Sequence, residues 1–198
     1  MEFDKSYWEK LFIEKDMPWD IGYVSTPIKE YIDQLTDKEL KILIPGCGNG
    51  YEAEYLFSKG FKNVYILDWS DIAINNFLTR FPQFPQSNIF NQDFFIHTPQ
   101  YDLIIEQTFF CALHPSMREQ YVKKMHELLL HEGKLAGLLF NRQFSKEGPP
   151  FGGTKEEYRE LFESYFHFKH FDECYNSIPP RAGNELFINF TKKKFDFI

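Results

Sequence analysis

The stretch "ILIPGCGNGYE", residues 42–52, places three glycines directly after a run of apolar residues. Glycine-rich loops that follow strands commonly hold phosphate groups, but the absence of a Gly-Lys-Ser/Thr sequence here excludes a P-loop. Gly46 and Gly48 fit the first two positions of the dinucleotide fingerprint, whereas Tyr51 stands at the third and would obstruct close helix packing. We therefore expect a bare backbone loop that admits a ligand without pyrophosphate, such as S-adenosylmethionine. The alternative is an ordinary turn between a strand and a helix.

Around this loop the chain alternates apolar strands with helical patterns. Strands are expected at 41–45, 63–68, 101–107 and 134–140, and helices at 51–60, 71–81, 114–133 and 155–166. Ser70 is expected to cap the second helix, and Thr154 with Glu157 forms a capping box for the last. This alternation predicts an α/β fold with a Rossmann-like, mostly parallel sheet and helices on both faces. Residues 167–175 and 185–193 are expected to add a C-terminal antiparallel hairpin, all within a single domain spanning 1–198.

Composition and charge exclude several classes of protein. With 198 residues, 43% of them hydrophobic and 19% aromatic, the chain can bury a substantial core and is not disordered. A net charge of -7 disfavours nucleic-acid binding. No apolar stretch approaches the ~18 residues of a membrane span, so no membrane partner is expected. The three cysteines form no CxxC pair, which predicts reduced thiols in the cytoplasm and no metal site.

Two acidic residues lie where strands are expected to end beside the glycine loop. Asp68 ends the second strand, where a carboxylate can accept hydrogen bonds from both ribose hydroxyls of a nucleoside. Asp93, in "NQDFF", is expected to end the next strand and to meet the adenine amine, with Phe94 against the ring. Each aspartate has a simpler alternative role as a turn or cap residue.

The second half of the chain contains the candidates for the acceptor side. Glu106, at the carboxyl end of its strand, is expected either to orient the cofactor ammonium or an acceptor proton, or to be structural. Arg181, in "SIPPRAG", can pair with an anionic acceptor or fix its own loop. Phe151, in "EGPPFGG", is expected to line the acceptor pocket unless this segment is an ordinary connection. Cys111 is expected to be a small buried residue, and no covalent intermediate is expected.

Five stretches carry a resemblance over nearly the whole chain, in the same order: "PWDIG", "ILIPGCGNGYE", "YDLIIEQTFFCAL", "GPPFGG" and "SIPPRAGNELF". Together they resemble the thiopurine and thiol/halide methyltransferase family of class I S-adenosylmethionine-dependent enzymes. The resemblance implies methyl transfer to a small thiol, a thiopurine-like compound or a halide by in-line displacement, with S-adenosylhomocysteine as product. It implies a small-molecule acceptor as partner. We also expect no metal, and a monomer or weak homodimer.

The resemblance also assigns residues. An aromatic N-terminal lid segment, residues 1–24, is implied to close over the cofactor. The cofactor-binding positions implied are Trp8, Phe12, Trp19, Gly46, Asp68, Asp93, Phe94 and Gln107. Phe12 and Gln107 stand where the plant enzymes have tryptophan and tyrosine. Indole faces attract a positively charged sulfonium, so Trp8 and Trp19 can contact the cofactor directly. The alternative is that both residues only anchor the segment to the core.

Two other functions stay open at this point. An NAD(P)-dependent reductase uses a similar sheet, although Tyr51 at the third glycine position counts against it. A binding module that holds S-adenosylmethionine without turnover also fits, because positioning supplies most of the catalysis in such methyl transfers and leaves no diagnostic catalytic residue.

Overall fold

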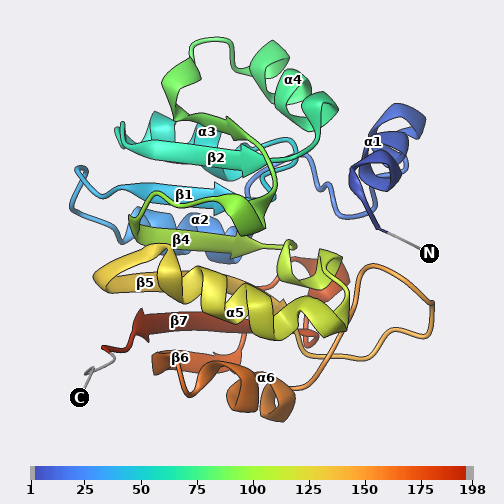
Figure 1. Cartoon of the computed structure of the whole chain (residues 1–198), viewed down its shortest axis with the longest axis vertical. Coiled ribbons are helices and arrows are strands. Elements are labelled where there is room, and N and C mark those ends of the chain that lie inside the picture. The colour runs from blue at the N-terminus through green and yellow to red at the C-terminus, as the bar shows by residue number, and fades with distance from the viewer. Residues whose placement is uncertain (1–2, 195–198) are drawn as a thin grey trace. The chain divides into compact units, whose positions relative to one another are not determined.

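Six α-helices and seven strands lie along residues 3–194, the part of the chain that a computed structural model describes (Figure 1). The strands belong to one mixed sheet. By its contacts the chain divides into two compact units, Met1–His97 and Thr98–Ile198. The expectation of a single domain over 1–198 includes residues 1–2 and 195–198, which lie outside the described residues, and it stays a prediction.

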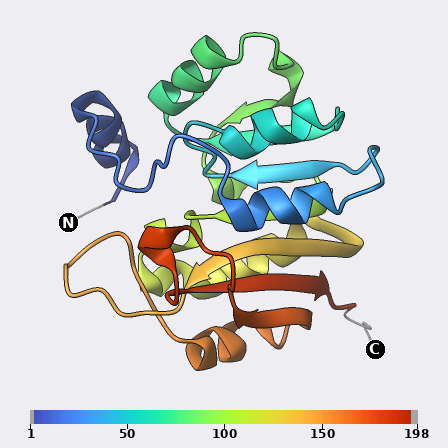
Figure 2. The ribbon, with the colours of Figure 1, turned by 180° about the vertical axis from the view of Figure 1, so that it is seen from behind.

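The first unit contains three parallel strands in the order β3-β2-β1. Its elements are α1 (Lys5–Glu14), α2 (Thr26–Asp33), β1 (Ile42–Pro45), α3 (Tyr51–Ser58), β2 (Val64–Asp68), α4 (Asp71–Arg80), η1 (Gln86–Asn88), β3 (Ile89–Asn91) and η2 (Phe94–Ile96). Helices α2 and α3 lie on the same face of β1 and β2 (Figure 2). The register pairs Ile42 with Val64 and Ile66 with Ile89, so the carboxyl ends of β1 and β2 come together beside the glycine loop.

The second unit contains four strands in the order β4-β5-β7-β6. Its elements are β4 (Tyr101–Gln107), η3 (Phe110–Ala112), η4 (Pro115–Met117), α5 (Arg118–Glu127), β5 (Leu129–Phe140), α6 (Lys155–Phe162), β6 (Phe166–Glu173), η5 (Pro179–Arg181) and β7 (Glu185–Lys192). Strands β4 and β5 are parallel, whereas β7 is antiparallel to both β5 and β6. The predicted C-terminal hairpin is therefore confirmed.

The predicted boundaries differ from the structure mainly between α5 and β5. The helix expected over 114–133 ends at Glu127, and the strand expected at 134–140 begins at Leu129. Leu129 pairs with Tyr101, and the register shifts after Tyr101. Gly133 therefore lies inside a strand and does not end a helix. In the same way, the helix expected over 155–166 ends at Phe162 because Phe166 begins β6.

The helix caps and the core agree with the sequence pattern. Ser70 caps α4 by accepting the Ala73 N–H, and Thr154 with Glu157 forms the capping box of α6. Large apolar and aromatic side chains fill the interior, among them Ile28, Ile32, Phe61, Phe77, Phe84, Tyr101, Phe110, Tyr121, Tyr158, Phe162, Phe166 and Phe190. All three cysteines are buried and free. Among the described residues no helix has both the length and the apolar character that a membrane crossing requires.

Candidate functional site

The glycine loop between β1 and α3 is a left-handed turn that side chains rarely tolerate. Gly46, Gly48 and Gly50 have φ angles of 58°, 51° and 66°. A Cβ atom at Gly50 would lie 2.6 Å from Cδ2 of Phe77, which is fully buried in α4. Position 50 therefore requires glycine, both because of its left-handed backbone and because a side chain there would overlap Phe77. This explains why the third glycine stands at 50 and not at the position of Tyr51.

Asp68, at the end of β2, holds the glycine loop through its carboxylate. Oδ2 accepts the N–H of Gly48 at 3.0 Å, and Oδ1 accepts the N–H of Ser70 at 2.9 Å. Burial raises the pKa of Asp68, while the N–H groups of Ser70, Gly48 and Trp69 oppose that rise. Each carboxylate oxygen can accept more than one hydrogen bond, so these contacts leave acceptor capacity for ribose hydroxyls.

The three N-terminal aromatic residues form one cluster. The Trp8 and Trp19 rings lie 5.6 Å apart between centroids, and the Phe12 and Trp19 rings 5.9 Å apart, both with edge-to-face geometry. A Cβ atom at Gly48 would lie 4.0 Å from both Cζ of Phe12 and Nε1 of Trp19. The structure therefore brings the cluster and the bare backbone of the loop together.

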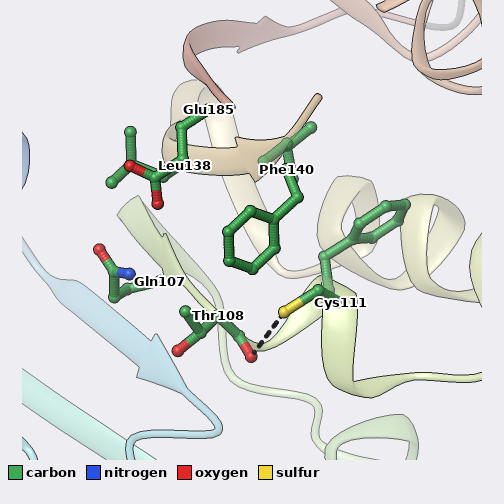
Figure 3. Close-up of a pocket in the computed structure, with 8 residues that line it drawn as sticks. Gln107, Thr108, Cys111, Leu138, Phe140 and Glu185 are labelled. Carbon is green, nitrogen blue, oxygen red and sulfur yellow. Dashed lines mark hydrogen bonds between the residues drawn. The ribbon is translucent and has the colours of Figure 1, made fainter. Parts of the chain in front are cut away.

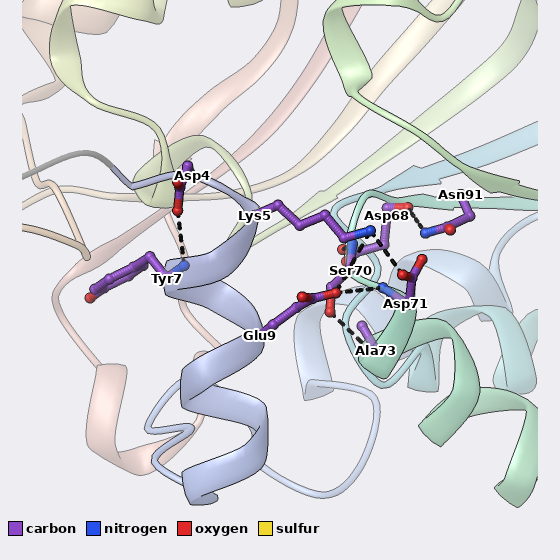
Figure 4. Close-up of polar contacts among 9 residues, drawn as sticks. All are labelled: Asp4, Lys5, Tyr7, Glu9, Asp68, Ser70, Asp71, Ala73 and Asn91. Atoms are coloured by element: carbon purple, nitrogen blue, oxygen red, sulfur yellow. Dashed lines mark hydrogen bonds and ion pairs between the residues drawn. The ribbon is translucent and has the colours of Figure 1, made fainter.

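Helix α1 is fixed to the start of α4 by charged groups (Figure 4). Lys5 Nζ contacts Asp71 Oδ2 at 2.9 Å, and Glu9 accepts the N–H of Asp71 at 3.2 Å. The side chains of Lys5 and Asp71 are 42% and 58% exposed, so this ion pair contributes little to stability. Its effect is to hold α1, which carries Trp8 and Phe12, against the start of α4.

Asp20 is a site residue that the sequence analysis missed. One carboxylate oxygen accepts a hydrogen bond from the Asn49 side chain and another, at 3.4 Å, from the Tyr51 hydroxyl. The other oxygen accepts the N–H of Gly22 at 2.7 Å. Asp20 thereby ties the segment that carries Trp19 to the glycine loop. The sequence signal that could have indicated Asp20 is its position directly after Trp19 in "PWDIG".

Asp93 and Phe94 follow β3, the neighbour of β2. Strand β3 ends at Asn91, so Asp93 lies just beyond the strand and caps η2 by accepting the Phe95 N–H at 2.8 Å. Phe94 is buried. The side chain of Asn91 donates to the Asp68 carbonyl at 3.0 Å, which holds the ends of β2 and β3 together. Trp69, half-buried directly after Asp68, was not singled out from the sequence.

Glu106 is fully buried at the end of β4, in the second unit. Oε1 accepts the N–H groups of Phe109 and Phe110 at 2.8 and 2.9 Å, and Oε2 accepts the Tyr121 hydroxyl at 2.5 Å. Burial raises the pKa of Glu106 to about 7, and the three hydrogen bonds oppose that rise. Of the two roles expected for Glu106, these contacts favour the structural one, which is to hold the turn after β4.

A small pocket lies within the second unit (Figure 3). It is lined by Gln107, Thr108, Phe110, Cys111, Leu138, Leu139, Phe140 and Glu185. Gln107 thus lines this pocket, while Phe151 and Arg181 are not among its lining residues. The Phe151 N–H donates to the Cys111 carbonyl at 2.7 Å, and the Arg181 guanidinium contacts Glu185 at 3.6 Å.

The residues of the first unit fit S-adenosylmethionine in chemistry. Asp68 offers an acceptor for ribose hydroxyls, the glycine loop offers backbone without side chains, and the aromatic cluster offers π faces to a cation. A cofactor role for each residue stays a prediction. Among residues 3–194 no group of three or more His, Cys, Asp or Glu side chains is arranged to hold a metal ion.

Comparisons with known proteins agree on one family. The family model described as thiopurine S-methyltransferase matches residues 3–187. The "Probable thiol methyltransferase 2" of Arabidopsis thaliana is 31% identical over 78% of this chain and 70% of its own length. "Thiocyanate methyltransferase 1" of the same plant is 30% identical over 90% of this chain and 81% of its own length.

A comparison of structures agrees on the fold. The crystal structure of Burkholderia thailandensis 1,6-didemethyltoxoflavin-N1-methyltransferase, with bound S-adenosylhomocysteine, has a TM-score of 0.76 and 16% identity, covering 96% of this chain and 87% of that one. The expected fold, a Rossmann-like sheet of the class I methyltransferase type with an antiparallel C-terminal part, is therefore confirmed.

Proposed function

The chain belongs to the thiopurine S-methyltransferase family of S-adenosylmethionine-dependent methyltransferases, and we propose that its acceptor is a small soft nucleophile: a thiol, a thiopurine-like compound or a halide. The family excludes the reductase alternative. The names of the relatives, which specify a thiol and thiocyanate, support a sulfur acceptor.

The observation that carries this function is the Asp68 carboxylate, which holds the glycine loop beside the aromatic cluster. S-adenosylmethionine supplies an electrophilic methyl group on a positively charged sulfur. Asp68 accepts hydrogen bonds from its ribose, and Trp8 and Trp19 attract the charge and exclude water. Thiols ionise near pKa 8.5, so positioning, worth on the order of 7 to 11 kcal/mol, carries most of the catalysis.

Asp68→Ala is expected to weaken S-adenosylhomocysteine binding by about 1.5 to 3 kcal/mol, since it removes charge-assisted hydrogen bonds to the ribose and releases Gly48. That change raises the dissociation constant about 10- to 150-fold in calorimetry. Asp37→Ala, an exposed loop aspartate in the same unit, serves as the control and leaves the constant unchanged. Equal dissociation constants for the two variants would remove Asp68 from the site.

Trp19→Ala is expected to weaken the same binding more than Phe12→Ala does. An indole face attracts a cation more strongly than a phenyl ring does, and one such contact is worth about 0.5 to 2 kcal/mol, the upper end when water is excluded. Phe12 is 7% exposed, so its removal should appear mainly as a lower melting temperature. The measurement compares S-adenosylmethionine with S-adenosylhomocysteine, whose sulfur carries no charge, in each variant. A cation–π role requires that Trp19→Ala affects S-adenosylmethionine more, and an equal loss for both ligands would contradict it.

Turnover separates this function from a binding module without catalysis. Radiolabelled S-adenosylmethionine is incubated with the protein and a panel of thiols, a thiopurine and iodide. A labelled methyl product from any of them supports the proposal, while tight binding with no product supports the module. We further propose that the protein is cytoplasmic, because its three buried cysteines are all free. We also propose that it is a single domain, a monomer or weak homodimer, and that it uses no metal.

A further inference from the structure

Asp20 and Asn49 join two segments of the first unit that carry expected cofactor-binding positions. Residues 15–25 connect α1 to α2 and form neither a helix nor a strand. Trp19 lies in this connection, and a Cβ atom at Gly48 would lie 4.0 Å from its Nε1. Connecting segments are more mobile than the helices and strands that they join. Side-chain contacts such as those of Asp20 therefore hold Trp19 at the glycine loop.

Four side chains close a ring of contacts on the glycine loop. One carboxylate oxygen of Asp20 accepts hydrogen bonds from the Asn49 amide and the Tyr51 hydroxyl. The Arg80 guanidinium lies over the Tyr51 ring, 4.3 Å from its centroid, and donates to the Asn49 carbonyl at 2.6 Å. Glu54 accepts from Nε of Arg80 at 2.9 Å. Because each member of the ring contacts two others, the ring holds Asp20 and Asn49 in one arrangement.

Two carboxylates hold neighbouring residues of the glycine loop. Asp68 accepts the N–H of Gly48 at 3.0 Å. Asp20 accepts from the side chain of the next residue, Asn49. The second oxygen of Asp20 accepts the N–H of Gly22 at 2.7 Å, which fixes the direction of the carboxylate. Because hydrogen bonds to ionised acceptors are about twice as strong as those between neutral groups, losing the Asn49 contact would free the connection from the loop.

We propose that Asp20 is a positioning residue for the cofactor: its hydrogen bond with Asn49 holds Trp19 at the glycine loop and thereby slows cofactor release. This inference rests on the proposed function and concerns the same site. Asp20 acts here through Asn49 and Trp19 and touches no reacting atom. The quantity that it sets is the residence time of the bound cofactor or its demethylated product.

Asn49→Asp is the sharpest single change, because it places a second carboxylate where Asp20 now accepts a hydrogen bond. Release of S-adenosylhomocysteine should accelerate about 10- to 100-fold, as for the loss of a hydrogen bond to a charged group. Stopped-flow tryptophan fluorescence measures it, since all three tryptophans lie in the first unit. Asp16→Asn, a charge change at an exposed residue of the same connection, should release the ligand at the wild-type rate.

Exchanging the two residues is the matched rescue. In the double variant Asp20→Asn/Asn49→Asp, the new amide at position 20 can donate to the new carboxylate at position 49. Its oxygen can still accept the N–H of Gly22. Both single variants should release the ligand faster than wild type, and the double variant should return to within about fivefold of the wild-type rate, because the two changes are coupled. Independent structural effects would add, and the double variant would then release faster than either single one.

Melting temperatures separate a folding defect from a loss of position. All folded variants are compared at a temperature at which each is fully native. If Asn49→Asp does not fold, Asp20→Ala replaces it, since this change removes the hydrogen bond without adding repulsion. Release from Asp20→Ala should be about tenfold faster or more, and release at the wild-type rate would contradict the proposal.

The failures are distinguishable. Release at the wild-type rate from folded Asn49→Asp, or a double variant that releases faster than either single variant, would overturn the role of Asp20 and leave the methyltransferase function intact. Absence of S-adenosylhomocysteine and S-adenosylmethionine binding by the folded wild type would overturn the proposed function and this inference with it.

Discussion

Replacing Gly50 by alanine is expected to lower the free energy of unfolding by about 2 to 5 kcal/mol. Two costs add at this position. A left-handed backbone costs an alanine about 1 to 2 kcal/mol, and Gly50 has a φ of 66°. The new methyl group would also lie 2.6 Å from the buried Phe77 ring, and such overpacking costs about 1 to 3 kcal/mol. Chemical denaturation of wild type and variant measures the difference.

Gly60→Ala is the matched control for this prediction. Gly60 has a φ of 87°, but a Cβ atom there would meet nothing within 4 Å, so only the backbone cost applies. Gly50→Ala should therefore be clearly less stable than Gly60→Ala, and cofactor affinity should fall only in Gly50→Ala. Equal stability of the two variants would contradict the packing of the loop against α4.

Glu106→Ala is expected to lower the free energy of unfolding by at least about 3 kcal/mol at pH 7. The change leaves the N–H groups of Phe109 and Phe110 and the Tyr121 hydroxyl without their acceptor, and each such loss costs about 1 to 3 kcal/mol when the group is buried. Glu106→Gln keeps an oxygen for the N–H groups and an amide beside Tyr121. We expect this conservative variant to fold and to be as stable as wild type, or more stable, above neutral pH.

The pH dependence of stability gives Glu106 a second signature. Burial raises the pKa of Glu106 to about 7 in the folded chain, from an ordinary value of 4.5. Well below pH 4.5 the carboxyl is protonated in the folded and the unfolded chain, and its contribution to the free energy of unfolding is fully present. As pH rises toward 7, ionisation favours the unfolded state and stability falls by on the order of 3 kcal/mol, with no further loss above that pH. Glu106→Gln should remove this slope. A folded Glu106→Gln protein with no turnover would instead assign Glu106 to catalysis.

The first half of the fold was predictable because its signals are local. The apolar run before the glycines and the cap at Ser70 each act within a few residues, and the structure places β1, α3, β2 and α4 accordingly. The position of Asp68 was predictable, because the apolar strand before it ends beside a loop without side chains. Its carboxylate accepts a hydrogen bond from the Gly48 N–H, which is a physical reason for an acidic residue at this strand end.

The boundary at 129–133 was not predictable from local pattern. "ELLLHEG" reads as the end of a helix, yet pairing of Leu129 with Tyr101 draws these residues into β5. Tertiary contacts override local propensity at such points. Helix-length errors of this kind leave the site untouched because they lie away from the strand ends that carry it.

The site residues that escaped the sequence analysis depend on contacts between distant segments. Asp20 has meaning only once its carboxylate is seen to accept from Asn49 and Tyr51. The resemblance assigns Trp8, Phe12 and Trp19 to a lid over the cofactor; the structure places their rings together, and their cofactor role stays a prediction.

Titration calorimetry of the purified protein with S-adenosylhomocysteine tests the central claim most directly. The account predicts saturable binding at one site per chain, weakened about 10- to 150-fold in Asp68→Ala and unchanged in Asp37→Ala. No heat of binding from the folded wild type, with either this ligand or S-adenosylmethionine, would contradict it.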